Sequence, residues 1–128
     1  MLKYGYKREV DLPYETAVQQ VIAELKKAGF GVPSQINVRA LLKDKLNVDF
    51  ENYIILGACN PPFAHQALQA EPDIGLMMPC NIIVYEKGGK TYVAGILPTL
   101  SMSMTGNEKL RGIAEQVEQK FKTVIDNV

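Results

Sequence analysis

The stretch CNIIVYEKGGKTYVAGIL, residues 80–97, decides the fold because it has the pattern of a β-hairpin. Two runs rich in β-branched and aromatic residues flank Gly88 and Gly89, and a glycine pair permits the positive φ angles of tight hairpin turns. Pro98 follows the second run and is expected to end that strand. The hairpin predicts a sheet built at least partly from antiparallel strands.

Three further strands are expected outside the hairpin. Residues 4–12 alternate loosely between apolar and polar side chains, as a half-buried strand does. Residues 30–38 are a weaker candidate, because Pro33 cannot donate to a hydrogen-bond ladder and so implies a sheet edge or a bulge. The segment NYIILGAC, residues 52–59, has the apolar content of a buried strand that ends at Cys59.

Two helices are expected in the first half of the chain. After Pro13, apolar residues follow one another at helical spacing until Gly29, which is expected to stop the helix. Asn37 stands where it can cap a short helix over residues 38–46.

The second half of the chain predicts two more helices. Asn60, followed by a proline, is placed to cap a helix that runs to Ala70. Thr105 and Glu108 have the spacing of a capping box before the final amphipathic helix. Between them, the alternating segment SMSM, residues 101–104, suits a strand that presents both methionines on one face.

These elements predict a single α+β domain over residues 1–128, a two-layer sandwich with amphipathic helices packed on one face of a curved, mostly antiparallel sheet. An exposed edge or face of that sheet would support a homodimer.

Composition narrows the classes of function. The 128 residues include 14 basic and 14 acidic side chains, so the basic surface typical of a nucleic-acid-binding protein is not expected. The N-terminal MLKYGYKREV has charges where a signal peptide needs an apolar core, and the longest apolar stretches are too short to span a membrane. We therefore expect a cytoplasmic protein without nucleic-acid or membrane partners, in which Cys59 and Cys80 are reduced thiols.

Two Cys-Asn pairs are the candidate site. If the strand that ends at Cys59 and the strand that begins at Cys80 are antiparallel neighbours, then Cys59, Asn60, Cys80 and Asn81 meet at one rim of the sheet. The start of a helix after Cys59 favours its thiolate form, and the asparagine amides offer hydrogen bonds to a polar ligand. The structural alternative is that both cysteines are small buried hydrophobes.

His65 lies on the helix that follows Cys59 and is the one histidine of the chain. It is a candidate partner for a thiol nucleophile or for a metal, although a lone helical histidine is more often a surface residue. Cys59, His65 and Cys80 lack the paired spacing of a structural zinc site.

Methionines extend the metal hypothesis. Thioethers combined with thiolates suit Cu(I), although methionines more often fill gaps in a core. The candidates are Met77, Met78, Met102 and Met104.

Residues 53–87, YIILGACNPPFAHQALQAEPDIGLMMPCNIIVYEK, closely resemble the signature of the domain of unknown function 302 family, and residues 28–50 resemble the family's segment after its first helix. The resemblance implies a compact α+β domain similar to the TATA-binding-protein-like class, often dimeric, with no assigned activity. Where members commonly have Thr-Glu-Ile-Asp, this chain has Ser34-Gln35-Ile36-Asn37. The family motif corresponds here to Gly57, Ala58, Cys59, Asn60 and Pro61, then to Gly75, Pro79, Cys80 and Asn81.

Three functions follow in order of preference. The first is a homodimeric domain that binds a small ligand or metal, or senses redox state, at the rim formed by Cys59, Asn60, Cys80 and Asn81, with His65 nearby. The second is a structural or protein-interaction module in which the Cys-Asn pairs only cap strands and helices. The third is a thiol-based enzyme, for which the sequence identifies no cofactor.

Overall fold

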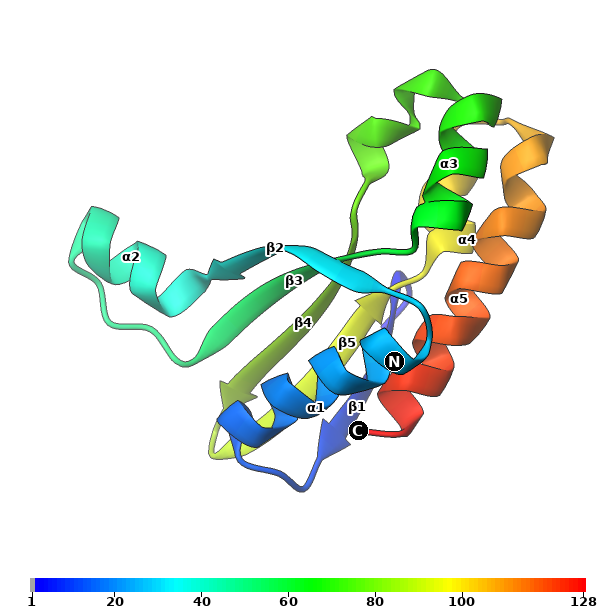
Figure 1. The fold of residues 1–128 in the computed structure, drawn as a ribbon. Coiled ribbons are helices and arrows are strands. Elements are labelled where there is room, and N and C mark those ends of the chain that lie inside the picture. The colour runs from blue at the N-terminus through cyan, green and yellow to red at the C-terminus, as the bar shows by residue number, and fades with distance from the viewer. Residues whose placement is uncertain (1) are drawn as a thin grey trace.

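The computed structural model describes residues 2–128. Five strands and their helices follow one another along the chain (Figure 1). Their bounds are β1 Gly5–Val10, α1 Tyr14–Lys27, β2 Gly31–Asn37, α2 Val38–Leu46, β3 Tyr53–Cys59, α3 Pro61–Ala70, η1 Pro72–Met77, β4 Cys80–Lys87, β5 Lys90–Ile96, α4 Pro98–Ser103, η2 Glu108–Leu110 and α5 Arg111–Asp126.

The strands form one antiparallel sheet in the order β1-β5-β4-β3-β2. The predicted hairpin is confirmed: β4 and β5 pair up to Lys87 and Lys90, with Gly88 at φ 60° and Gly89 at φ 78° in the turn. Both angles lie in the left-handed region that glycine adopts without strain. The hairpin therefore occupies the middle of the sheet.

Helices α1 and α5 cover one face of the sheet, as expected for an α+β sandwich (Figure 1). Their apolar faces are buried against the strands because alternate strand residues point toward the same side. Phe121 of α5 packs against Phe30, with ring centroids 5.2 Å apart. The largest fully buried side chains are Phe121, Leu25, Leu56, Ile74, Ile82, Leu110, Ile125, Val21, Val84, Val93, Val124 and Pro98.

Two of the three predicted helix caps are confirmed. The Asn37 side chain accepts a hydrogen bond from the Ala40 N–H at the start of α2, and Asn60 caps α3 in the same way. The capping box at Thr105 and Glu108 is wrong. Because Gly106 turns the chain with φ 68°, the Asn107 side chain caps the one-turn helix η2 instead, by accepting from the Lys109 N–H.

The expectation of a strand at residues 101–104 is also wrong. This segment belongs to the short helix α4 and the turn after it, because Pro98 starts a helical turn directly after β5. Met102 is consequently buried, whereas Met104 is 74% exposed. The two methionines do not share one face.

Strand β2 is an edge strand, and its register shifts between Gly31 and Ser34, so both structural consequences expected from Pro33 are present. From its end, α2 projects away from the rest of the molecule (Figure 1). None of the residues Val38–Leu46 is buried.

Candidate functional site

The two Cys-Asn pairs meet at one rim of the sheet, as the sequence predicts. Strands β3 and β4 are antiparallel neighbours, with Ala58 opposite Cys80 and Gly57 opposite Asn81. The end of β3 therefore lies beside the start of β4, and residues that are about twenty positions apart in the chain become neighbours.

The faces of the sheet divide these residues between two environments. Cys80 shares the helix-covered side with Ala58 and Ile82, and all three are buried. Asn81 points to the opposite side because consecutive strand residues alternate, and it lines a separate hollow of about 150 Å³ with Ile83 and neighbouring residues. The structure thus separates Asn81 from the cysteines.

A small hollow, here called the thiol hollow, is lined by both cysteines. Its volume is about 30 Å³. Cys59 is half-buried at the point where β3 gives way to α3, whereas Cys80 is buried on β4. The other lining residues are Phe30, Ala58, Asn60, Phe63, Ala64, Ala67, Met78, Pro79, Met102, Ile113 and Val117.

Burial determines the protonation of Cys80. Its side chain is 9% exposed, and loss of solvation raises the pKa of the Cys80 thiol from 9.0 to about 11, with a smaller contribution from Cys59. An apolar site disfavours the charged thiolate. Cys80 is therefore a neutral thiol at pH 7.

The polar candidates have different positions. The Asn60 Oδ1 atom accepts a hydrogen bond from the Phe63 N–H at 3.4 Å, so its oxygen is used to cap α3 while the residue also lines the thiol hollow. His65 is exposed on α3 and is not among the residues that line this hollow. The structure accordingly brings Cys59, Asn60 and Cys80 together and leaves His65 outside.

Gly57 lets the chain segments around the rim approach one another. A Cβ atom at this position would collide with the Ser34 Oγ atom and would lie 2.6 Å from the Pro79 Cγ atom. A side chain at Gly57 would therefore push apart β2 and the segment that leads into Cys80. Close backbone approach is one of the few requirements that only glycine meets in a strand.

Met78 and Met102, two of the four candidate methionines, line the thiol hollow, whereas its aromatic wall lies beyond the residues singled out from the sequence. Phe63 and Ala67 lie one helical turn apart on α3, which is a detectable apolar spacing, but Phe30 gives no comparable local signal. Its contribution depends on where the segment between α1 and β2 lies in the fold.

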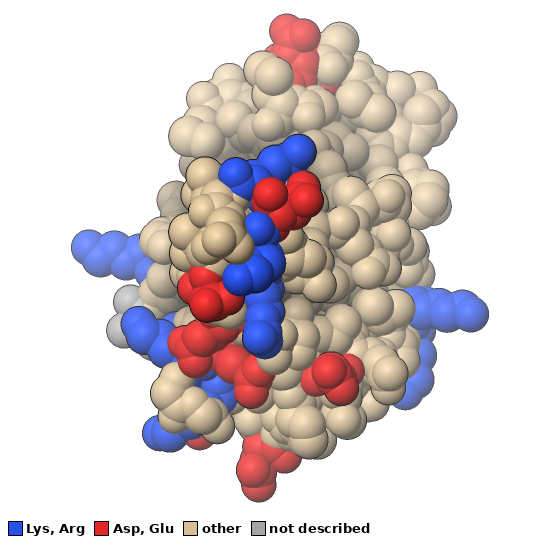
Figure 2. Space-filling model, turned by 90° about the vertical axis from the view of Figure 1, so that its left-hand side faces the viewer, with Lys and Arg blue, Asp and Glu red and all other residues tan. Residues whose placement is uncertain are grey.

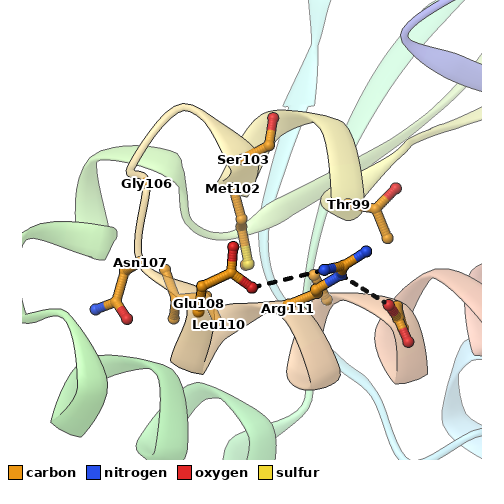
Figure 3. Close-up of a pocket in the computed structure, with 10 residues that line it drawn as sticks. Thr99, Met102, Ser103, Gly106, Asn107, Glu108, Leu110 and Arg111 are labelled. Carbon is orange, nitrogen blue, oxygen red and sulfur yellow. Dashed lines mark ion pairs between the residues drawn. The ribbon is translucent and has the colours of Figure 1, made fainter.

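A larger hollow of about 360 Å³ lies between α4 and the start of α5 (Figure 3). Arg111 lies there between Glu108 and Glu115, with nitrogen–oxygen distances of 3.6 and 3.5 Å. One guanidinium against two carboxylates leaves these three side chains with a formal charge of −1, so they do not form a cationic site for an anion. Met102 lines both this hollow and the thiol hollow.

Within residues 2–128, no group of three or more His, Cys, Asp or Glu side chains is placed to hold a metal ion. A metal at the rim would need other ligands, and the lining of the thiol hollow offers the thioethers of Met78 and Met102 and the amide of Asn60. Across the same residues, no helix combines the length and apolar character needed to cross a bilayer.

The side of the sheet turned away from α1 and α5 is rich in aromatic and aliphatic side chains. Tyr85 stacks between Tyr53 and Tyr92, with ring centroids 5.2 Å apart in both pairs. The Lys7 ammonium lies 4.7 Å from the Tyr92 ring centroid. Because Ile36 pairs with Ile55 and Ile55 with Ile83, these three isoleucines form a second row, and we call this surface the open face.

Together these features define an α+β protein with an antiparallel sheet, helices on one face and a thiol-lined hollow at the rim. The chain belongs to the DUF302 family: residues 6–128 match the family described as "Domain of unknown function DUF302". The resemblance seen in the signature is thus confirmed.

A solved structure has the same architecture. The crystal structure of an uncharacterised conserved DUF302 protein from Bacillus stearothermophilus is similar with a TM-score of 0.92 and 28% sequence identity, over 98% of each chain. No curated protein matches the chain.

Proposed function

We propose that this protein is a small binding domain whose site is the thiol hollow, with Cys59 at the mouth and Cys80 at the back. The observation that supports it is the convergence of both cysteines, from different strands, on one hollow. Reduced thiols of this kind suit the cytoplasm, where disulfides are rare.

The size of the thiol hollow limits the ligand. Pockets for organic ligands usually measure about 300–1,000 Å³. A hollow of about 30 Å³ admits an ion or a group of very few atoms. The ligand is therefore not a metabolite of ordinary size, and a reaction of the thiol itself with a small reagent is equally compatible with these dimensions.

Thiol accessibility in the folded state tests this proposal. Reduced protein is treated with methyl methanethiosulfonate, which adds a small group to thiols, and its mass is measured with and without denaturant. We expect one modification in the folded protein, at Cys59, and two after unfolding, with Cys59→Ser as the control that abolishes the first. If Cys59 reacts only after unfolding, the hollow is sealed and the cysteines are structural.

We also propose that the protein functions as a homodimer, with a second copy covering the open face and α2. A nine-residue helix without buried side chains receives little stabilisation from its own chain, since short helices depend on packing. Leu46 is 65% exposed, and Ile36, Leu41, Val48 and Phe50 are also exposed. Figure 2, which views the side from which α2 projects, shows a central group of charged side chains of both signs, further charged side chains at the edges of the view, and uncharged surface between them.

A second copy is a suitable partner because the projecting helix and the open face belong to the same chain. A two-fold axis would let α2 of each copy contact the open face of the other copy. The same contact would then occur twice and would cover both α2 helices and both open faces. The formal net charge of zero removes the overall repulsion between copies.

Analytical ultracentrifugation tests the dimer. We expect the wild-type protein to sediment as a dimer and Leu46→Glu to sediment as a monomer that retains its circular dichroism spectrum. Leu76 is 88% exposed on η1 and is distant in sequence from α2, so Leu76→Glu is the matched control and should remain dimeric. A wild-type monomer at all concentrations, or equal dissociation by both variants, would contradict the proposal.

A further inference from the structure

Four sulfur-containing residues line the thiol hollow. Cys59 ends β3, Cys80 begins β4, Met78 precedes the Pro79–Cys80 segment, and Met102 lies on α4. Four sulfur-containing residues from three chain segments thus border a space of about 30 Å³. Two thiols and two thioethers are an unusual concentration of soft donors for such a volume.

This donor set discriminates between possible occupants. A buried water molecule needs two to four polar partners, and among the residues that line this hollow Asn60 alone has a side chain with oxygen or nitrogen atoms. Hard cations such as Mg²⁺ and Ca²⁺ need oxygen ligands, whereas thiolate and thioether sulfur select Cu(I). The chemistry of the lining therefore favours a soft monovalent ion.

Charge balance also favours this ion. When Cu(I) bonds to the Cys80 sulfur, the thiol proton passes to solvent, and the thiolate carries one negative charge against one positive charge on the ion. The thioethers of Met78 and Met102 add no charge, so the buried group is neutral overall. An uncompensated charge in the same apolar space would be costly.

Met102 stands between the thiol hollow and a larger neighbouring hollow. Its side chain forms a wall shared by the thiol hollow and the 360 Å³ hollow beside α4, and Figure 3 shows it extending from α4 toward α5. Methionine has three rotatable side-chain bonds and adapts readily to its surroundings. Rotation of Met102 would connect the two hollows.

We propose that the thiol hollow binds one Cu(I) ion through the Cys80 thiolate and the thioethers of Met78 and Met102, with Cys59 at its mouth. This inference rests on the proposed function, because it requires the hollow to be a ligand site. It adds the class of ligand and the residues that hold it.

Anaerobic competition between the reduced protein and the Cu(I) chelator bicinchoninate tests the inference. We expect one Cu(I) per chain in the wild-type protein. Loss of an outer partner commonly weakens a metal site about 10- to 100-fold, so removal of a ligand by Cys80→Ala or Met102→Leu should weaken Cu(I) binding at least about tenfold. Cys59→Ala should keep the stoichiometry of one.

Met104→Leu is the matched control for Met102→Leu, because Met104 is two residues away but exposed and outside the lining of the thiol hollow. It should leave Cu(I) affinity unchanged. Leucine and methionine have similar volumes, so both variants should fold, and thermal unfolding of the metal-free proteins checks this. X-ray absorption at the copper edge should show sulfur as the only neighbouring element.

The results separate the two proposals. Cu(I) could bind no better to the wild-type protein than to a Cys59→Ala, Cys80→Ala double variant, while folded Cys59 still reacts with methyl methanethiosulfonate. That result would refute Cu(I) as the ligand but leave the proposal that the hollow is a binding site. Nitrogen or oxygen neighbours around copper, or equal effects of Met102→Leu and Met104→Leu, would also overturn the inference. If folded Cys59 resists modification, both proposals fall.

Discussion

Replacement of Cys80 by alanine should remove a specific loss of stability at alkaline pH. In the unfolded chain the thiol ionises near 9.0, whereas burial raises the pKa of Cys80 in the folded protein to about 11. Between these values the unfolded state has lost the proton and the folded state retains it. The free energy of unfolding therefore falls as the pH rises through this window. The buried neutral thiol makes its full contribution to that free energy below pH 9.

The magnitude follows from the two pKa values. The difference between 9.0 and about 11 corresponds to about 2.7 kcal/mol once the pH exceeds both values, because each pH unit contributes about 1.4 kcal/mol. At pH 10.5 most of this loss has occurred. Between pH 8 and pH 10.5, the free energy of unfolding of the wild-type protein should fall by roughly 2 kcal/mol more than that of Cys80→Ala.

Urea unfolding of reduced, metal-free protein at these two pH values measures the difference. Burial also raises the pKa values of Tyr14 and Tyr53, but their effects occur in both proteins and cancel in the comparison. Cys59→Ala is the matched control, because it removes a thiol and keeps the buried one, so it should retain most of the wild-type loss. If Cys80→Ala shows the same pH dependence as the wild-type protein, the Cys80 thiol is not shielded from water.

Two more substitutions test how the rim is built. Gly57→Ala forces a methyl group against Ser34 and Pro79 and should lower the free energy of unfolding by about 1–3 kcal/mol, whereas Gly75→Ala, whose new Cβ meets nothing within 4 Å, should lower it much less in the same urea titration. Equal losses would show that close approach is not the reason for glycine. Asn60→Ala removes the cap of α3 and should cost about 1 kcal/mol in thermal unfolding, with Asn60→Ser restoring most of it. A cost near zero would mean that the cap is dispensable.

Local signals in the sequence predict most of the fold. The glycine pair of the hairpin, the cap at Asn37 and the effect of Pro33 all depend on residues adjacent in the chain, and all three are observed. The two wrong predictions, the strand at residues 101–104 and the capping box at Thr105 and Glu108, arise where two local signals favour different structures. At residues 101–104 the strand alternation is overridden by the helical turn that Pro98 starts.

The candidate site was predictable only in part. Antiparallel pairing places Ala58 opposite Cys80 and so brings Cys59 close to the start of β4, and the sequence predicts this only on the condition that the two strands are antiparallel neighbours. The same pairing also assigns Asn81 to the other face, a consequence of alternation that applies once the register is known. The contribution of Phe30 depends instead on the path of the chain after α1, which no pattern in the sequence specifies.

The position of α2 has a consequence for local motion. None of its residues is buried, so opening this segment exposes little additional apolar surface and requires little of the free energy that protects the central strands. Slow amide hydrogen exchange in α2 would therefore report on the surface that covers it, while exchange in β4 and β5 would report on the global stability of the fold.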